Sequence, residues 1–344
     1  MNISDKVLSP SEAARKLGVS VKALRIYEQR GLVAPFRTSA GWRAYGADEM
    51  MRASEVVALR AIGFNLAQIA RALNGDTQGL EKALADHQAA LEGQLREMSR
   101  IVERVRRLRG DLVSGHAPSV NELTRLQMRE AALVVAFDLP WPWGGERYEL
   151  RCIRPLNYIT GPLFSGKTRL ALRLAETLPN ATFVGLERSA EGGAGSRLKI
   201  DADPVLQSRV DQALAWLVED GATPSEALLA LLARLEADGP NILVIDMIEQ
   251  GLDEATQQAL IAHLRRRGAD GRPLFLLTRS NAILDLASVG LHESIIYCPA
   301  NHNAPMQVAP YPGAPGYEAV ATCLAAPDVR ARTEGVIAWR PPAA

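Results

Sequence analysis

The stretch "NYITGPLFSGKTRLAL", residues 157–172, joins an apolar strand-like run, a glycine-rich turn and an amphipathic helical run. Its centre, Gly161-x-x-x-x-Gly166-Lys167-Thr168, matches the Walker A pattern in the strand–turn–helix context that this pattern requires. Glycines let backbone amides converge on phosphate oxygens, and the start of the following helix adds positive potential. The sequence therefore predicts a P-loop nucleotide-binding domain, α/β in class, with a largely parallel sheet.

The pattern also assigns roles to side chains. Lys167 would reach the β- and γ-phosphates of ATP, and Thr168 would offer its hydroxyl to Mg²⁺. The magnesium needs a carboxylate at the end of a buried strand, and Asp246 follows the apolar run 242–245. The predicted nucleotide-binding residues are Gly161, Ser165, Gly166, Lys167, Thr168, Arg169 and Asp246, of which Thr168 and Asp246 would hold Mg²⁺.

The surrounding sequence predicts further strands and loops. The runs 131–137, 147–153 and 156–160 have strand patterns, and the apolar run 274–277 is typical of a parallel sheet covered on both faces. Trp141 or Trp143 is placed to stack on adenine or simply to pack. The polar, glycine-rich segment 187–204 predicts a mobile loop in which Arg188 or Arg197 contacts phosphate or DNA. Residues after 299 are expected to be irregular around one strand.

This C-terminal part resembles the ATP-binding-cassette branch of P-loop proteins, through Asp246, the run Gly251-Leu252-Asp253 and the run Thr278-Arg279-Ser280. It is closest to the small cytosolic forms of the overcoming-lysogenisation-defect and chromosome-maintenance groups. Three departures stand out: Met247 at the position of the catalytic glutamate, Arg279 at that of the switch histidine, and a degenerate signature loop at 222–229. Because a base must orient the attacking water, the resemblance implies bound ATP with weak or no hydrolysis. Glu249 is the candidate substitute base.

The N-terminal part has a different character. Residues 1–75 hold 11 Lys or Arg against 6 Asp or Glu, although the whole chain is balanced at 39 of each, so this part favours an anionic partner. Residues 8–32 predict two short helices, the first capped by Ser9 or Ser11 and ended by Gly18, the second capped by Ser20. A helix-turn-helix and an ordinary helical hairpin fit this stretch equally well.

The following residues favour the helix-turn-helix. They are Leu24-Arg25-Ile26-Tyr27-Glu28, Gly31-Leu32, Pro35, Arg37, Gly41-Trp42-Arg43-Ala44-Tyr45 and Gly63-Phe64-Asn65-Leu66-Ala67-Gln68-Ile69, and in this order they resemble the MerR family of transcription regulators. The resemblance implies an all-α winged helix-turn-helix whose second helix enters the major groove of double-stranded DNA. Ser20 and Lys22 would reach base edges, and Arg25, Arg37 and Arg43 would neutralise phosphates. Tyr27 and Tyr45 would donate hydroxyls to the DNA backbone, although Tyr27 fits a core position equally well.

Residues 77–114 predict one long helix with apolar residues at coiled-coil spacing. The alternative is a surface helix packed on its own domain. The MerR resemblance implies an antiparallel pair, hence a homodimer and an inverted-repeat operator. The segment 111–127 at the end of this helix contains no cysteine, which argues against a metal sensor, and His116 is more typical of a loop than of a ligand.

The length of 344 residues is enough for two or three domains. We expect a DNA-binding domain at 1–75, a dimerisation helix at 76–114, a linker at 115–130 and a nucleotide-binding domain at 131–344. The start of the chain has no signal-peptide pattern, no apolar run could span a bilayer, and the three cysteines, Cys152, Cys298 and Cys323, lie far apart, so we expect a cytoplasmic protein.

The domain order leads to one main functional hypothesis. It is a dimeric DNA-binding transcription regulator whose DNA binding or distortion is controlled by ATP and Mg²⁺. A rival is an active DNA-linked ATPase of a mobile element or defence system that uses the MerR head for docking. A second rival keeps the P-loop fold with a vestigial nucleotide site.

Overall fold

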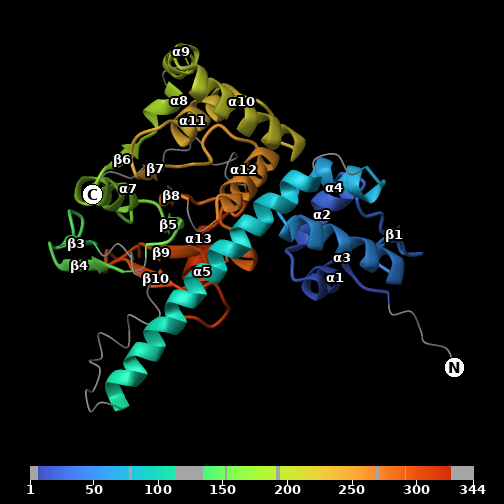
Figure 1. Ribbon diagram of the computed structural model, residues 1–344, viewed down its shortest axis with the longest axis horizontal. Coiled ribbons are helices and arrows are strands. Elements are labelled where there is room, and N and C mark those ends of the chain that lie inside the picture. Colours follow the sequence, from blue (N-terminus) through green and yellow to red (C-terminus); the bar gives the residue numbers. More distant parts are fainter. Residues whose placement is uncertain are drawn as a thin grey trace, which may run out of the picture.

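The computed structural model describes residues 7–76, 80–113, 135–151, 153–190, 194–268, 271–290 and 292–326. Figure 1 shows the N-terminal helices on one side, an α/β region on the other, and the long helix α5 (Leu80–Val113) running diagonally across the view. The predicted linker, with His116, and also Cys152 lie outside the described residues. Among the helices that are described, none has the length and apolar character needed to cross a membrane.

The N-terminal region (residues 7–76) begins with α1 (Pro10–Leu17) and α2 (Val21–Gln29). The Ser9 side chain accepts a hydrogen bond from the Glu12 amide, and the Glu12 carboxylate accepts one from the Ser9 amide, so this capping box fixes the start of α1. Gly18 ends α1 in the left-handed conformation, and Ser20 caps α2. The two predicted helices are confirmed, and Ser9 rather than Ser11 is the cap.

The rest of this region is a small wing and two further helices. Strands β1 (Phe36–Arg37) and β2 (Arg43–Ala44) pair antiparallel, and α3 (Ala47–Ala61) and α4 (Leu66–Leu73) follow. Their apolar faces meet in one core, whose most buried members include Ala13, Leu24, Tyr45, Ala53, Val56 and Ile69. The predicted long helix is confirmed as α5.

The α/β region (residues 135–326) is built on a six-stranded sheet in the order β10-β9-β5-β8-β7-β6. All neighbouring strands are parallel except β10, which pairs antiparallel with β9. The strands are β5 (Leu156–Thr160), β6 (Ala181–Val184), β7 (Ile242–Ile245), β8 (Leu274–Leu277), β9 (Glu293–Tyr297) and β10 (Met306–Val308). A separate antiparallel hairpin consists of β3 (Val135–Asp138) and β4 (Arg147–Leu150). The mostly parallel α/β architecture agrees with the expectation from sequence.

Both faces of the sheet are buried, because successive side chains of a strand point to opposite faces. Ile242 and Val244 of β7 join the core that includes α7 (Lys167–Thr177) and the β3–β4 hairpin. Leu243 and Ile245 join the core that includes α10 (Pro204–Glu219), α11 (Glu226–Glu236) and α12 (Glu254–Arg266). The central strands are therefore held rigidly, and their carboxyl ends provide fixed positions for a site.

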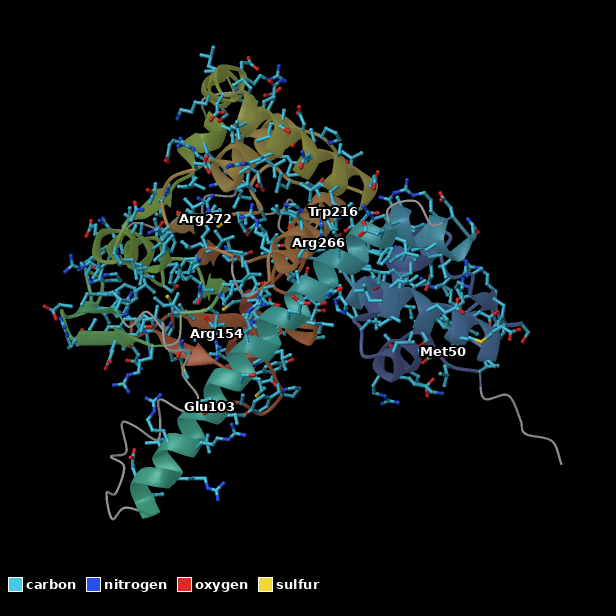
Figure 2. All side chains as sticks on the ribbon, viewed as in Figure 1. Met50, Glu103, Arg154, Trp216, Arg266 and Arg272 are labelled. Carbon is cyan, nitrogen blue, oxygen red and sulfur yellow. The ribbon has the colours of Figure 1, made fainter. Side chains whose placement is uncertain are left out.

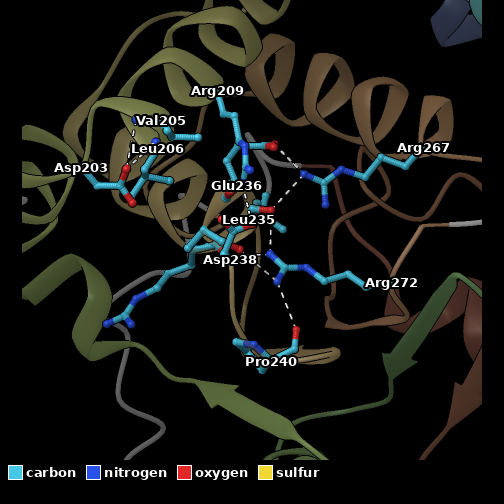
Figure 3. Close-up of polar contacts among 12 residues, drawn as sticks. Asp203, Val205, Leu206, Arg209, Leu235, Glu236, Asp238, Pro240, Arg267 and Arg272 are labelled. Atoms are coloured by element: carbon cyan, nitrogen blue, oxygen red, sulfur yellow. Dashed lines mark hydrogen bonds and ion pairs between the residues drawn. The ribbon is translucent and has the colours of Figure 1, made fainter.

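Arginines complete the end of α11, as Figure 3 shows. The guanidinium of Arg272 donates to the carbonyls of Arg234, Leu235, Ala237 and Pro240. Arg267 donates to the Leu235 carbonyl and to the Glu236 carboxylate. These bonds satisfy carbonyls that the helix end leaves without intrahelical donors.

Two expectations for the loops are wrong. The segment 187–204 contains the helices α8 (Glu187–Ala190) and α9 (Ala194–Ala202) rather than only loop, and Ile200 of α9 is packed into the core of the sheet. After residue 299 the expected single strand is present as β10, but a helix, α13 (Tyr317–Cys323), follows it. Val320 of α13 is fully buried, so a tertiary contact rather than a strong local pattern holds this helix. A short 3₁₀ turn, η2 (Leu286–Ser288), lies between β8 and β9.

Candidate functional site

The glycine-rich loop 161–166 joins the central strand β5 to helix α7. Gly161 has φ 152°, and a Cβ there would lie 2.3 Å from the carbonyl oxygen of Cys298, after β9. Gly166 has φ 87°, and a Cβ there would lie 2.5 Å from the ring of Trp143. Only glycine fits these two positions without displacing its neighbours, so the two glycines fix how the loop is seated on the sheet.

The ammonium group of Lys167 lies inside the turn of this loop. It donates to the carbonyl oxygens of Gly161 at 3.0 Å and Pro162 at 2.6 Å, and to the Ser165 hydroxyl at 3.4 Å. Burial lowers the pKa of Lys167, and the charge of Arg279 lowers it further. A cation that is partly desolvated in this way, at the start of a helix, favours an anionic ligand.

Thr168 at the start of α7 and Asp246 just after β7 bring two oxygens together at the carboxyl edge of the sheet. The Thr168 hydroxyl donates to Asp246 Oδ2 at 3.1 Å, although 78 residues separate them in sequence. Burial raises the pKa of Asp246, while the Thr168 hydrogen bond and the charge of Arg188 oppose the rise. Two adjacent ligands of an octahedral Mg²⁺, with bonds of about 2.1 Å, lie about 3 Å apart. The spacing and the oxygen donors therefore fit a magnesium ion. The two side chains that the sequence named as magnesium ligands therefore lie side by side in this structure.

The segment after β7 is held by a buried arginine. Arg188 donates to the carbonyls of Gly185 at 2.9 Å, Asp246 at 2.6 Å and Met247 at 2.5 Å, and its side chain is almost fully buried. Met247 has a positive φ of 43°. Arg188 therefore holds backbone in this structure, whereas the sequence suggested a loop residue that contacts phosphate or DNA. Arg197 pairs with Glu226.

Glu249, the candidate base, is also tied to the backbone. Its carboxylate accepts a hydrogen bond from the Arg279 amide at 3.0 Å, and the residue is 4% exposed. This bond joins the segment after β7 to the end of β8, so in this structure Glu249 has a positioning role. Thr168 and Arg169 are exposed at the start of α7, whereas Ser165 is buried in the loop.

The two tryptophans before the loop have different environments. Trp143 is buried, its ring lies against Gly166, and its indole N–H donates to the Asn303 carbonyl at 3.1 Å. Trp143 is therefore a packing residue. Trp141 is 76% exposed, so its ring remains accessible for stacking.

The predicted DNA contacts lie in two different environments. Arg25 on α2 and Arg37 in the wing are exposed, and Arg37 also donates to the Gly41 carbonyl. Arg43 pairs with Glu28 at 2.6 Å and keeps about a third of its side chain exposed. All three arginine side chains keep solvent-exposed surface in this structure.

The tyrosine predictions need correction. Tyr27 is 6% exposed and lies in the core of the N-terminal region, which was the alternative to a DNA contact. Burial raises the pKa of Tyr27. Tyr45 is completely buried, and its hydroxyl donates to the Glu28 carboxylate. Neither side chain is presented to DNA here, because each fills the small core beneath the wing.

Ser20 and Lys22, the predicted base-edge residues, face the α/β region. The Ser20 side chain caps α2 by accepting from the Ala23 amide. The Lys22 ammonium pairs with Glu254 at the start of α12 and lies 3.4 Å from the side-chain oxygen of Asn281. No sequence pattern pointed to Glu254 or Asn281, because 232 and 259 residues separate them from Lys22 (254 − 22 and 281 − 22).

Comparisons with known proteins agree with the N-terminal architecture. The profile of the MerR HTH family regulatory proteins matches residues 8–76. The chain is 31% identical to the nodulation protein NolA of Bradyrhizobium elkanii over 154 residues, which is 41% of this chain and 68% of NolA. It is 32% identical to a "Probable heavy metal-dependent transcriptional regulator" of Haemophilus influenzae over 28% of this chain and 80% of that protein. The chain belongs to the MerR family.

Other matches are partial. The alignment with NolA of Bradyrhizobium sp. NC92, at 36% identity, spans 29% of this chain and 42% of that protein. A solved MerR family regulator lacking the sensor domain, bound to promoter DNA, is similar over 32% of this chain and 92% of its own, with 22% identity and a TM-score of 0.25. An ATP-binding cassette of an ABC transporter in its ADP conformation is similar over 59% of this chain and 99% of its own, with 12% identity and a TM-score of 0.38.

Proposed function

We propose that this chain is a dimeric DNA-binding transcription regulator whose DNA binding or distortion is controlled by ATP and Mg²⁺ bound in the α/β region. The observation that carries the proposal is the meeting of Lys167, Thr168 and Asp246 around one glycine-rich loop, in a chain that also has a MerR head. The proposed domains are 1–75 for DNA binding, 76–114 for dimerisation, 115–130 as linker and 131–344 for nucleotide binding.

The loop supports nucleotide binding as a Walker A element. Lys167 would exchange its present bonds to loop carbonyls for the β- and γ-phosphates, and the freed loop would present its amides to the same groups. Thr168 and Asp246 would hold Mg²⁺, which would neutralise part of the phosphate charge. Trp141 remains accessible for stacking on adenine.

The long helix supports a dimer. Its exposed apolar side chains recur at coiled-coil spacing and stay at least 37% exposed beside the rest of the described chain; they include Leu84, Leu91, Leu95, Met98, Val102 and Val105. An antiparallel pair of these helices would bury them and place two heads on an inverted-repeat site. Leu95→Glu, at the most exposed of these positions, is expected to shift the chain toward monomer in analytical ultracentrifugation, whereas Glu103→Gln on the same helix should leave the dimer intact.

Weak hydrolysis follows from the residues after β7. Met247 has no group that can accept a proton, and Glu249 is bound to the Arg279 amide. Turnover of several per second without an activator would favour the rival proposal of an active DNA-linked ATPase.

Equilibrium binding of a fluorescent ATP analogue with Mg²⁺ tests the nucleotide site. Lys167→Ala is expected to abolish binding and leave a folded, DNA-binding dimer, while the exposed Lys199→Ala in the same region is the matched control. Arg25→Ala should weaken DNA binding and leave nucleotide binding unchanged. Wild-type chain that binds no nucleotide would overturn the proposed control by ATP.

Regulation requires the two sites to be coupled. If ATP changes DNA affinity by some factor, DNA must change ATP affinity by the same factor. DNA titrations with and without ATP should therefore differ for the wild type and coincide for Lys167→Ala. Wild-type curves that coincide, with DNA bending also unchanged, would leave the nucleotide without a regulatory role.

A further inference from the structure

The N-terminal region and the α/β region touch through two groups of polar contacts. The first group lies at the end of α10, where Asp220 accepts from Arg60 at 2.6 and 3.2 Å and from the Leu66 amide at 2.9 Å. Glu219, beside it, accepts from the Asn65 side chain at 2.8 Å. These contacts use α3 and α4, which carry none of the predicted DNA contacts. They fix the orientation of the N-terminal region relative to the α/β region.

The second group engages the helix that would read DNA. Lys22 of α2 pairs with Glu254, the first residue of α12, and approaches Asn281 after β8. A cavity of about 1090 Å³ lies between α2 and α12, and Ser20, Lys22 and Arg25 line its N-terminal side. On the opposite side lie Glu254, Asn281 and Asp285, which offer carboxylate and amide oxygens to this basic surface. Arg265 and Arg266 line the same side, but Arg265 is paired with Glu293 and Arg266 lies over the Trp216 ring. Figure 2 shows Trp216 and Arg266 at the edge of the α/β region that faces the head.

We propose that Glu254 and Asn281 form a docking surface for the DNA-reading helix of this same chain, and that the docked chain cannot engage a duplex. The inference rests on the proposed function in that α2 is taken as the reading helix. A helix that reads a major groove about 12 Å wide has phosphate backbones on both of its sides. In the docked chain α12 lies across the cavity on one side of α2, where a phosphate backbone would run, and the Lys22 ammonium is already neutralised by Glu254.

The docking surface is connected to the candidate nucleotide site. Glu254 follows Asp246 by eight positions, and Asn281 follows the end of β8 by four (254 − 246 and 281 − 277). The Ser280 hydroxyl donates to the Gln257 side chain at 2.6 Å, so the segment that carries Asn281 is bonded to α12, which carries Glu254. The Glu249–Arg279 bond joins the same two segments near Asp246. A ligand that displaces the segments after β7 and β8 would therefore move both docking residues together.

A zero-length carbodiimide crosslink detects the docked state in the full chain without nucleotide. The reagent joins an amine and a carboxylate only when they are in contact, so free protein should yield a Lys22–Glu254 crosslinked peptide by mass spectrometry. An excess of a short mixed-sequence duplex at low salt should suppress it. Absence of this peptide from the free protein would overturn the proposal. A Lys22–Glu254 link found only between two chains would also overturn it, because docking would then be between subunits.

Affinity for DNA supplies the second measurement. Glu254→Gln should raise affinity for a fluorescein-labelled duplex about two- to fivefold, the range of a partly exposed ion pair. Glu226→Gln is the matched control. Glu226 is likewise the first residue of a helix and is paired with an arginine, Arg197, and its replacement removes the same charge. Unchanged or weaker binding by Glu254→Gln, or an equal rise in the control, would overturn the masking of α2.

These arms separate docking from nucleotide control. The crosslink and the two glutamine variants are measured without ATP, so their results do not depend on whether the P-loop binds nucleotide. If nucleotide releases the docked helix, ATP and Mg²⁺ should lower the yield of the Lys22–Glu254 crosslink in the wild type and leave it unchanged in Lys167→Ala. A yield that ATP does not change, beside a positive Glu254→Gln result, would leave docking in place and remove ATP as its release signal.

Discussion

Replacing Gly161 by alanine tests how the glycine-rich loop is seated on the sheet. The added Cβ would lie 2.3 Å from the Cys298 carbonyl oxygen and 2.8 Å from the Ser165 hydroxyl oxygen. The carbonyl belongs to the backbone just after β9, so it cannot rotate away as a flexible side chain would. Gly239 offers a matched control, because its φ of 148° is close to the 152° of Gly161 and nothing lies within 4 Å of its Cβ position.

The two substitutions share one cost and differ in another. Holding a residue other than glycine at this positive φ costs about 1–3 kcal/mol in either place. Gly161→Ala adds the displacement of packed backbone, about 1–3 kcal/mol. We therefore expect Gly161→Ala to be less stable than Gly239→Ala by about 2 kcal/mol, or about 4–8 °C in Tm for a cooperative unit of roughly 200 residues.

Scanning calorimetry of both variants and of the wild type measures this difference. The carbonyl of Gly161 also accepts a hydrogen bond from Lys167, so the same variant should lose nucleotide affinity while Gly239→Ala retains it. Equal melting temperatures for the two variants would refute the close approach of the loop to the end of β9.

Three further outcomes follow from buried groups. Asp220→Ala should speed exchange of the Leu66 amide by about tenfold or more in hydrogen-exchange mass spectrometry, because a hydrogen bond to a charged group contributes about 1.5–3 kcal/mol; unchanged exchange would contradict the docked arrangement. Burial raises the pKa of Cys298 to about 12, so at pH 8 only about one molecule in ten thousand carries the thiolate, and iodoacetamide should label Cys298 only after unfolding. Rapid labelling in the native state would show that the thiol is accessible. Tyr45→Phe removes a donor from the Glu28 carboxylate and should lower the unfolding free energy of the N-terminal region by about 1–2 kcal/mol, and a neutral result in calorimetry would mean that Arg43 alone suffices for Glu28.

Local patterns predicted the parts of this fold that depend on neighbouring residues. Ser9, Gly18 and Ser20 mark helix ends because capping acts within a few positions. The buried strands β7 and β8 were predicted because a strand covered on both faces is apolar throughout. The Walker A pattern and the strand-ending carboxylate also suggested that Thr168 and Asp246 lie close together. They do, because the carboxyl ends of the parallel strands β5, β8 and β7 lie at one edge of the sheet, with β8 between the other two.

Other features depend on contacts that no local pattern records. The polar composition of residues 187–204 favoured a loop, yet Arg188 turns inward to carbonyls 58 and 59 residues away. The polar hydroxyl of Tyr45 favoured a DNA contact in the sequence. In the structure the ring of Tyr45 is buried in the core beneath the wing, and its hydroxyl donates to the Glu28 carboxylate. Lys22 and Glu254 are charged residues that the sequence alone would place on the surface. Only the arrangement of the two regions brings them together as an ion pair.

The character of that contact suits reversible docking. A permanent interface would be apolar and closely packed, whereas here a cavity of about 1090 Å³ remains between α2 and α12. Side chains that line a cavity lose dispersion contacts on one side, so this interface gains less from packing than the cores of the sheet do. The polar contacts then carry much of the docking, and the Lys22–Glu254 pair is partly exposed and therefore weak. DNA phosphates can replace Glu254 as the partner of Lys22 without loss of a charge pair. Full separation of the two regions would also require the bonds of Asp220 to Arg60 and to the Leu66 amide to break, and both regions could stay folded because each has its own hydrophobic core.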